Sequence, residues 1–432
     1  MPAEPRPGEA AAAAPVSDDE EAAALARVRS RLRRAGATDE EIDQAAEEDV
    51  LDLLAVDTLL LPAPRRYTQS DVAERTGLPL ELLRRLWRAL GFSDVAGDAL
   101  VFTDLDIEAA HMFLELVRLG VTDLDVAFQL ARVIGSSMAR IAETEVSSLR
   151  SLRDVDDVLA ADAFTSVADE ALPKLAELLA FVWRRHFQAA ARRAMLQRVR
   201  GDLSGDTAYL AVGFADMVGF TVLSQHLDEE QLAAVVRRFE ELSHDIVTAL
   251  GGRVVKMIGD EAMFVVERVV DAARIGVELA NAYADDELLS DVRVGLALGS
   301  VLLREGDYFG PTVNLASRIV NIADPGTVVV ADAFHEALVA AAPDEFDSGP
   351  LRPRTLKDLG RVQLWWCRRK GEAKPSPAAA PERRSRLLRL AEMLQELDEL
   401  RGVGERAVAG RPADGTPGSD LAETDGGDPE GT

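Results

Sequence analysis

Apolar side chains recur at helical spacing through the first half of the chain, as in the segments LPLELLRRLWRALGF and IEAAHMFLELVRLGV. No clear strand pattern interrupts them. Near Asp206 the pattern changes, because the run AYLAVGFADM is typical of a strand and the segments after it alternate between strands and helices. The pattern therefore predicts an all-α domain over residues 23–190, a linker over residues 191–205 and an α+β domain over residues 206–370.

Both ends of the chain have polar, low-complexity sequences. Residues 1–22 are rich in Pro, Ala and acid, and residues 371–432 are rich in Pro, Gly, Ala and acid, so we expect both segments to be mostly disordered. One amphipathic piece of the tail, residues 382–401, fits a helix or a coiled-coil seam, and it fits a solvated helix equally well.

Residues 67–92 of the helical domain resemble a helix-turn-helix. They predict a short helix, a turn at Thr76-Gly77 and a second helix that starts near Pro79. The second helix carries basic side chains of the kind that read DNA, namely Arg84, Arg85 and Arg88. The net charge of −27 repels phosphate backbones, however, so nucleic acid is not an expected partner, and packing or ligand sensing is the favoured role.

The composition predicts a soluble, cytoplasmic protein. The single cysteine, Cys367, excludes an internal disulfide framework and favours a reducing compartment. The acidic N-terminus lacks the basic and apolar regions of a secretory signal. The most apolar runs are broken by charges or prolines well before the roughly 20 residues that span a bilayer, so no membrane partner is expected.

The first strand of the α+β domain runs into FADMVGFT, with Asp216 at its end and Phe220 and Thr221 just before an expected helix. The backbone N–H groups from Val218 to Thr221 are expected to be unpaired and able to bind a phosphate. A carboxylate beside a phosphate is repulsive unless a divalent cation lies between them, so Asp216 is a candidate ligand for Mg²⁺ or Mn²⁺. Taken alone, an aspartate in this position is more commonly an N-cap.

The stretch VVKMIGDEAMFVV predicts two buried strands joined by a Gly-Asp turn. Asp260 lies in this turn, and a hairpin beside the first strand would bring it to Asp216. Two carboxylates together can hold two metal ions roughly 4 Å apart, one to activate an attacking hydroxyl and one to bind phosphates. An ordinary hairpin turn is the alternative explanation.

A third stretch, GDYFGPTVNLASRIV, contains Asp307, Asn314 and Arg318. Asn314 and Arg318 are four residues apart on an expected helix and therefore share one face. An amide and a guanidinium aimed at one spot suit an anionic transition state, although an exposed polar face explains either residue alone.

These three motifs, in this order, resemble the class III nucleotidyl cyclase catalytic domain over roughly residues 206–370. The resemblance implies a ferredoxin-like, palm-type sheet with flanking helices. It also implies that a homodimer with shared active sites converts ATP to 3′,5′-cyclic AMP and pyrophosphate. The residue roles that it implies are metal binding by Asp216 and Asp260, with two Mg²⁺ or Mn²⁺ ions per active site, adenine recognition by Lys256 and Asp307, and transition-state stabilisation by Asn314 and Arg318.

The resemblance places Lys256 and Asp260 in opposite active sites of the dimer. Adenine presents an acceptor at N1 and a donor at its amino group, which a lysine donor and an aspartate acceptor match, so ATP is expected over GTP. Lys357 falls near the triphosphate-binding lysine of the family. Its LKDLG context departs from the commoner LKG pattern, and a surface lysine explains it as well.

A helical domain before such a catalytic domain resembles a subgroup of soluble bacterial adenylyl cyclases with an autoinhibitory, pH-responsive regulatory domain. His186, in the segment VWRRHFQ, lies on the helix that leads toward the catalytic domain. Histidine is the side chain that changes charge near neutral pH without special tuning, so His186 is a candidate regulatory residue. A packing role is the alternative.

Two rival functions also fit part of the sequence. The segment IGDEAMF superficially resembles the Gly-Gly-Asp-Glu-Phe hairpin of diguanylate cyclases, but Ile258 stands in place of the first glycine. The other rival is a catalytically silent cyclase-like module that senses nucleotide or scaffolds a partner. The six matched polar positions argue against such decay.

Overall fold

The computed structural model describes residues 18–48, 50–120, 123–148, 157–200, 203–204, 206–286, 288–356 and 359–372. The chain divides into two compact units, residues 1–201 and residues 202–432. Lys357 and the expected helix over residues 382–401 lie outside the described residues.

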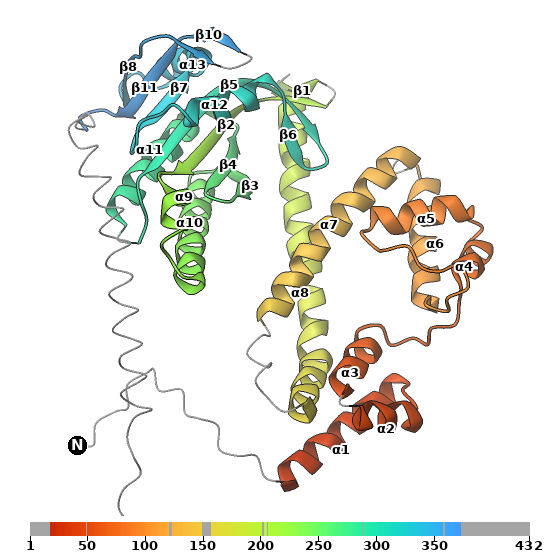
Figure 1. Ribbon diagram of the computed structural model, residues 1–432. Coiled ribbons are helices and arrows are strands. Elements are labelled where there is room, and N and C mark those ends of the chain that lie inside the picture. The colour runs from red at the N-terminus through yellow and green to blue at the C-terminus, as the bar shows by residue number, and fades with distance from the viewer. Residues whose placement is uncertain are drawn as a thin grey trace, which may run out of the picture. The chain divides into compact units, whose positions relative to one another are not determined.

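The described part of the first unit is helical, as the apolar periodicity predicts (Figure 1). Its helices are α1 (Asp18–Ala35), α2 (Asp39–Glu47), α3 (Leu51–Leu60), α4 (Gln69–Thr76), α5 (Leu80–Ala89), α6 (Asp104–Arg118), α7 (Leu124–Ser148) and α8 (Asp157–Arg200). One boundary differs from the expectation, because residues 18–22 are helical rather than disordered. The linker over residues 191–205 begins within α8, which continues to Arg200, where alanines and long side chains favour a helix.

Two separate cores stabilise this unit. The first joins α1, α2, α3 and α8 around buried side chains such as Leu32, Ile42 and Leu51. The second joins α4, α5, α6 and α7 around Leu83 and Phe128. In the described part of the chain, no helix is long and apolar enough to cross a membrane.

The helix-turn-helix segment has the predicted form. α4 begins with a capping box between Thr68 and Asp71 and ends at Gly77, whose φ of 72° lies in the left-handed region that favours glycine. Each basic side chain of α5 is held by an acidic one of the same unit. The pairs are Arg84 with Glu81 at 2.9 Å, Arg85 with Asp125 at 3.4 Å and Arg88 with Asp94 at 2.9 Å. These ion pairs argue against DNA recognition by this helix, because they neutralise its cations.

The second unit is built on one mixed sheet. Its strands are β1 (Leu203–Ser204), β2 (Thr207–Met217), β3 (Arg253–Ile258), β4 (Glu261–Val266), β5 (Val292–Arg304), β6 (Asp307–Phe309), β7 (Val328–Ala331), β8 (Phe346–Pro350) and β11 (Leu364–Arg369). The strand order is β3-β4-β2-β5-β7-β11-β8, with β1 paired to β2 and β6 paired to β5. Only β5 and β7 run parallel among these pairs. A separate ribbon pairs β9 (Arg354–Leu356) with β10 (Gly360–Val362).

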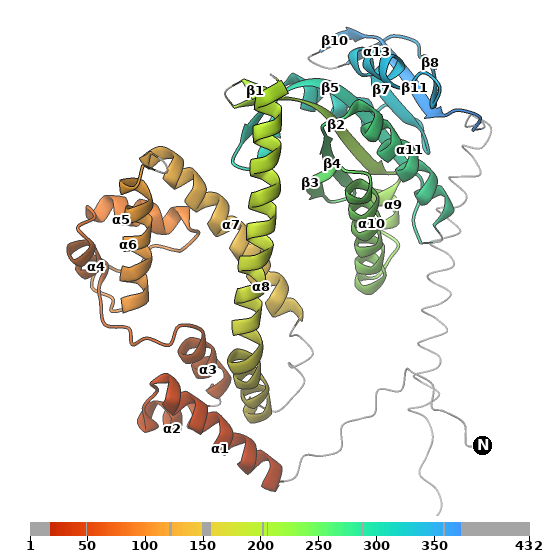
Figure 2. The ribbon, with the colours of Figure 1, turned by 180° about the vertical axis from the view of Figure 1, so that it is seen from behind.

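Helices cover the two faces of this sheet unequally (Figure 2). The helices are α9 (Phe220–Leu223), α10 (Glu229–Ala249), α11 (Val269–Asp285), α12 (Pro311–Val320) and α13 (Asp332–Ala341). The larger core lies under α10, α11 and α13, where Phe239, Phe264 and Tyr283 are fully buried. On the opposite face α12 packs on the sheet through Ala316 and Ile319. That second face carries the chemistry described next.

Candidate active site

The end of β2 and the β3–β4 turn bring two of the predicted residues together. Asp216 is the last residue but one of β2, and the backbone N–H of the next residue, Met217, donates a hydrogen bond of 2.9 Å to the carbonyl oxygen of Asp260. The turn has two central residues, and the φ of 63° at Gly259 suits the first position of a type II′ hairpin turn. The predicted hairpin and its position beside the first strand are therefore as expected.

Two further charged side chains surround Asp216, and the sequence reasoning did not assign a role to either. Asp216 is the cross-strand neighbour of Glu261 on β4 and of Arg293 on β5. Arg293 forms an ion pair with Asp216, and its buried Nε has no hydrogen-bond partner. The sequence does contain a pattern that could have identified Arg293 as a candidate functional residue. In the segment VRVGLALG, a single arginine interrupts an otherwise apolar central strand.

The carboxylates in this group oppose each other's ionisation. Burial raises the pKa of Asp216, and Asp260 raises it further, while the Arg293 guanidinium lowers it. Burial, followed by the charges of Asp216 and Asp260, raises the pKa of Glu261 to about 7, again against the influence of Arg293. A cation placed between these groups would relieve both the repulsion and the cost of burial.

The donor set of this group suits a hard divalent cation. Carboxylate oxygens are the ligands of Mg²⁺ and Mn²⁺, and magnesium sites commonly take one or two carboxylates and complete the coordination with substrate phosphates. In the part of the chain that the structure describes, no group of three or more His, Cys, Asp or Glu side chains is placed to hold a metal ion by itself. Asp216 and Asp260 therefore fit a metal whose remaining ligands come from outside the chain.

The backbone amides of residues 218–221, which were expected to bind phosphate, are only partly available for it. The N–H of Val218 donates a hydrogen bond of 2.9 Å to the carbonyl oxygen of Asp291, so this amide is not available for a phosphate. Gly219, with a φ of 75°, precedes α9. Phe220 packs its ring against the larger core, while Thr221 is exposed. The amides of Phe220 and Thr221 remain suited to a phosphate, because the first N–H groups of a helix have no intrahelical acceptor.

The predicted base-recognition residues form an ion pair within one chain. Lys256 on β3 contacts Asp307 at the start of β6, and the two side chains are 37% and 27% exposed. The second carboxylate oxygen of Asp307 accepts a hydrogen bond of 2.8 Å from the N–H of Tyr308. Arg253 donates a hydrogen bond of 2.7 Å to the Tyr308 hydroxyl and so also links β3 to β6. These contacts hold an ammonium donor and a carboxylate acceptor side by side at the surface.

Asn314 and Arg318 lie on the exposed face of α12. The opposite face of this helix is buried through Thr312, Ala316 and Ile319. Among the residues that the structure describes, no hydrogen bond or ion pair engages the side chain of Asn314 or Arg318. An amide and a guanidinium are thus displayed together without a partner in their own chain.

Asp216 and Lys256 lie on the α12 face of the sheet. Residues of β2 alternate between the two faces, and Leu210, Val212 and Phe214 belong to the α12 core, so Asp216 continues that series. Lys256 is the cross-strand neighbour of Met263, which is buried in the same core. The candidate residues thus form two groups, the carboxylates at the end of β2 and the polar residues of β3, β6 and α12.

Two of the predicted site residues are not placed among the candidate active-site residues described above. Lys357 lies outside the described residues, directly after the buried Leu356 of β9. His186 is exposed on α8 in the first unit, next in sequence to Arg185, whose guanidinium donates a hydrogen bond to Gln188. The aromatic rings of Trp183 and Phe187 beside it are 5.7 Å apart.

The sheet, its paired carboxylates and the polar face of α12 define a catalytic unit of the nucleotide cyclase type. The model of the adenylate and guanylate cyclase catalytic domain matches residues 205–367, and the model of the adenylate cyclase regulatory domain matches residues 18–186. The chain belongs to the class III adenylate cyclases, a family of enzymes that use divalent metal ions.

Named relatives are similar to this chain across both units. An adenylate cyclase of Streptomyces coelicolor is 40% identical over 66% of this chain and 75% of its own length. An adenylate cyclase of Streptomyces griseus is 36% identical over 69% of this chain and 75% of its own length. A protein of Mycobacterium tuberculosis named a pH-sensitive adenylate cyclase is 30% identical over 82% of this chain and 92% of its own length.

Replacing Glu261 with glutamine should stabilise the metal-free protein in a pH-dependent way. Because the pKa of Glu261 is raised to about 7 in the folded state from 4.5, the ionised carboxylate disfavours folding. This penalty is absent below about pH 4.5, grows as the pH rises and is fully present above about pH 7. We therefore expect Glu261→Gln to raise the melting temperature of metal-free protein at pH 8 and to change it little at pH 5.

Thermal unfolding with a chelator present measures this difference, and Glu336→Gln, a change at an exposed glutamate of α13, serves as the control. Added Mn²⁺ should reduce the advantage of the variant, because a cation also relieves the repulsion. An advantage of equal size at both pH values would contradict the assignment of a raised pKa to Glu261.

Proposed function

We propose that this enzyme converts ATP to 3′,5′-cyclic AMP and pyrophosphate. The observation that carries the proposal is the Lys256–Asp307 ion pair, whose Lys256 lies on the same face of the sheet as Asp216. The pair offers a donor to adenine N1 and an acceptor to the adenine amino group, whereas guanine would present the opposite pattern. The names of the relatives agree with this choice of substrate.

Two Mg²⁺ or Mn²⁺ ions per active site would be held by Asp216 and Asp260, together with the triphosphate. Bound there, the ions lower the pKa of the ribose 3′-hydroxyl and neutralise the charge of the phosphates. Arg293 holds the Asp216 carboxylate through their ion pair and so fixes the direction of its oxygens. The amides of Phe220 and Thr221 are candidates to bind phosphate oxygens next to these carboxylates.

The reaction forms one bond and breaks one. The ribose 3′-oxygen attacks the α-phosphorus in line with the bond to the β-phosphate, the hydroxyl proton is lost, and pyrophosphate leaves with the electron pair of the broken P–O bond. Asn314 and Arg318 would stabilise the negative charge that develops on the α-phosphate oxygens. Their exposure without a partner in their own chain is what this role requires.

The two groups of residues would serve different active sites of a homodimer. One protomer would supply the carboxylates and its partner would supply the base-recognition pair and the polar face of α12. A twofold dimer of this kind contains two equal sites. The exposed side chains of Asn314 and Arg318 support this arrangement, because they present their polar groups to whatever packs on the α12 face.

Product identification tests the proposed reaction. The full-length protein with Mn²⁺ and ATP should form cyclic AMP and pyrophosphate in equal amounts, and GTP should be converted much more slowly. Chromatography with mass detection separates the products. Cyclic GMP or cyclic di-GMP as the main product would contradict the proposal, and the absence of any product would favour a silent nucleotide-binding module.

Regulation by the helical unit is the remaining part of the proposal, with His186 as the pH-responsive residue. Its neighbours Arg184 and Arg185 make the segment cationic, so a further positive charge there would shift the equilibrium between two regulatory states. The name of the mycobacterial relative agrees with a response to pH.

We expect the full-length enzyme to be more active at mildly acidic pH and His186→Ala to flatten this profile, as measured by initial rates. Identical profiles for the full-length protein and a 206–370 fragment would contradict the regulatory model.

A further inference from the structure

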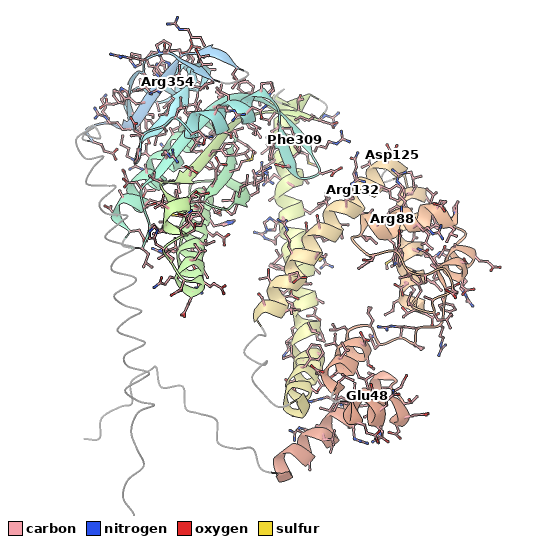
Figure 3. The ribbon with its side chains drawn as sticks, viewed as in Figure 1. Glu48, Arg88, Asp125, Arg132, Phe309 and Arg354 are labelled. Atoms are coloured by element: carbon pink, nitrogen blue, oxygen red, sulfur yellow. The ribbon has the colours of Figure 1, made fainter. Side chains whose placement is uncertain are left out.

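A cavity of about 630 Å³ lies at the end of the sheet away from β3, in the second unit. Its walls come from the end of α11, the connection between α12 and β7, the segment after β8 and strand β11. Figure 3 labels one lining residue, Arg354, over the β8–β11 end of the sheet, on the opposite side of the unit from Phe309 in β6. None of the described candidate active-site residues lines this cavity, so it is a second site.

Three arginines line the cavity, namely Arg352, Arg354 and Arg368. Arg352 and Arg354 are exposed, and within the described part of the chain neither side chain has a hydrogen bond or ion pair. In a chain with a net charge of −27, three arginines against two acidic residues in one lining are a local excess of positive charge.

Arg368 is fixed in position by its surroundings. Its guanidinium lies 4.8 Å from the centre of the Trp366 ring, and the closest acidic contact, to Asp347, is 3.5 Å. Trp366 in turn lies against Gly349, where an added Cβ would be 2.7 Å from the indole. Within the described residues, the Nε of Arg368 is buried and has no hydrogen-bond partner. The Trp366 ring and the Asp347 carboxylate therefore hold this guanidinium in place.

The rest of the lining limits the charge and shape of a ligand. Two acidic residues, Asp324 and Glu372, also line the cavity. Glu372 already accepts hydrogen bonds of 3.2 Å from the side chain of Asn281 and from the N–H of Arg369. Apolar side chains supply much of the remaining wall, namely Val277, Ile322, Val329 and Leu364. A single anionic group with an apolar body fits these walls, whereas a second anionic group would meet the acidic residues.

We propose that this cavity is a binding site for a small organic molecule with a single anionic group, with its carboxylate or phosphate held by Arg352, Arg354 and Arg368 and its apolar body against Ile322 and Leu364. The site is also placed to influence α12. Ile322 lies two residues beyond the end of α12 and donates its backbone N–H to the carbonyl oxygen of Ile319 on that helix at 3.1 Å. A ligand that packs on Ile322 therefore contacts the segment that anchors the helix of Asn314 and Arg318.

Calorimetric titration of the full-length protein tests the site directly. The probes are hexanoate and phenyl phosphate, which offer the two anionic groups on apolar bodies, and adipate, a dicarboxylate of the same chain length as hexanoate. We expect saturable binding of hexanoate or phenyl phosphate and binding of adipate that is weaker by about tenfold, because its second carboxylate meets Asp324 and Glu372. The stronger of the first two probes identifies the preferred anionic group.

Variants locate the binding. The double variant Arg352→Gln/Arg354→Gln should lose about tenfold or more in affinity, since both residues are exposed and their loss breaks no internal contact. Arg361→Gln, at an exposed arginine of β10 outside the cavity, is the matched control and should bind as the wild type does. Arg318→Ala should also retain binding, because the site is separate from the active site.

The binding measurements do not require cyclase activity, so they stand or fall independently of the proposed function. Absence of saturable binding for both hexanoate and phenyl phosphate would overturn the proposal. Equal affinity in the double variant, or loss of binding in Arg318→Ala, would also overturn it, because either result would place the probe elsewhere. A role through α12 rests on the proposed cyclase activity and requires that a saturating probe change the turnover of the wild type but not that of the double variant.

Discussion

Asp260→Asn should lower the turnover of the enzyme by about 1000-fold while leaving its fold intact. The change replaces one carboxylate oxygen by an amide nitrogen and removes a negative charge that the metal-binding role requires. A loss of this size corresponds to about 4 kcal/mol of transition-state stabilisation, which is within what metal ions supply to phosphoryl transfer. Asparagine is well tolerated in hairpin turns, so the β3–β4 turn should persist.

Initial rates measured over a range of Mn²⁺ concentrations separate the two ways in which Asp260 can act. If Asp260 binds metal, residual activity in the variant should require a higher metal concentration. Asp344→Asn is a suitable control, since the Asp344 side chain is 95% exposed and contacts only Lys370 among the contacts that the structure describes. A variant with near-normal turnover and unchanged metal dependence would show that Asp260 is only a turn residue.

The hairpin of this site shows how far a local pattern reaches. The Gly-Asp pair between two apolar runs predicts the turn. The polar face of α12 follows in the same way from the spacing of Asn314 and Arg318. Local periodicity is sufficient for these two predictions, whereas the pairing of β4 with β2 that brings Asp260 to Asp216 is a matter of strand order, which the local pattern does not fix.

Contacts between segments that lie far apart in the sequence were not predicted. Arg293 reaches Asp216 only because β5 lies beside β2, and a single sequence does not specify that strand order. The hydrogen bond from Val218 to Asp291 also joins segments far apart in the chain, and it removes an amide that the local pattern assigned to phosphate binding. The arginine-lined cavity combines four separate segments and has no contiguous motif.

The helical unit differs from its predicted extent for another reason. Its N-terminal boundary was placed too far along the chain, because composition alone separated the polar N-terminus from the helices. α1 begins at Asp18 and α8 extends to Arg200, since charged residues with high helix propensity continue a helix as readily as apolar ones. The ion pairs of the α5 arginines likewise depend on tertiary neighbours such as Asp125 of α7, which the pattern of α5 does not reveal.

A mixture of two inactive variants should regain activity if each active site is shared between protomers. Asp260→Asn impairs the carboxylate group and leaves α12 intact, whereas Arg318→Ala impairs α12 and leaves the carboxylates intact. In a heterodimer of the two, one site combines the intact carboxylates of one chain with the intact α12 of the other, and the second site carries both defects. Random pairing at equal amounts makes half of the dimers heterodimers with one working site of two, so about one quarter of the wild-type activity is expected.

Co-expression with two different affinity tags, followed by purification through both, isolates the heterodimer and should raise the recovery to about half of the wild-type activity per dimer. A second heterodimer, of Asp260→Asn with Asp216→Asn, is the matched control. Both of its chains lack a carboxylate, so every site is defective and no activity should return. Each single-variant homodimer should remain inactive for the same reason. A purified heterodimer of Asp260→Asn with Arg318→Ala that stays as inactive as this control would contradict the shared site, because an active site contained in one chain cannot be rescued by another chain.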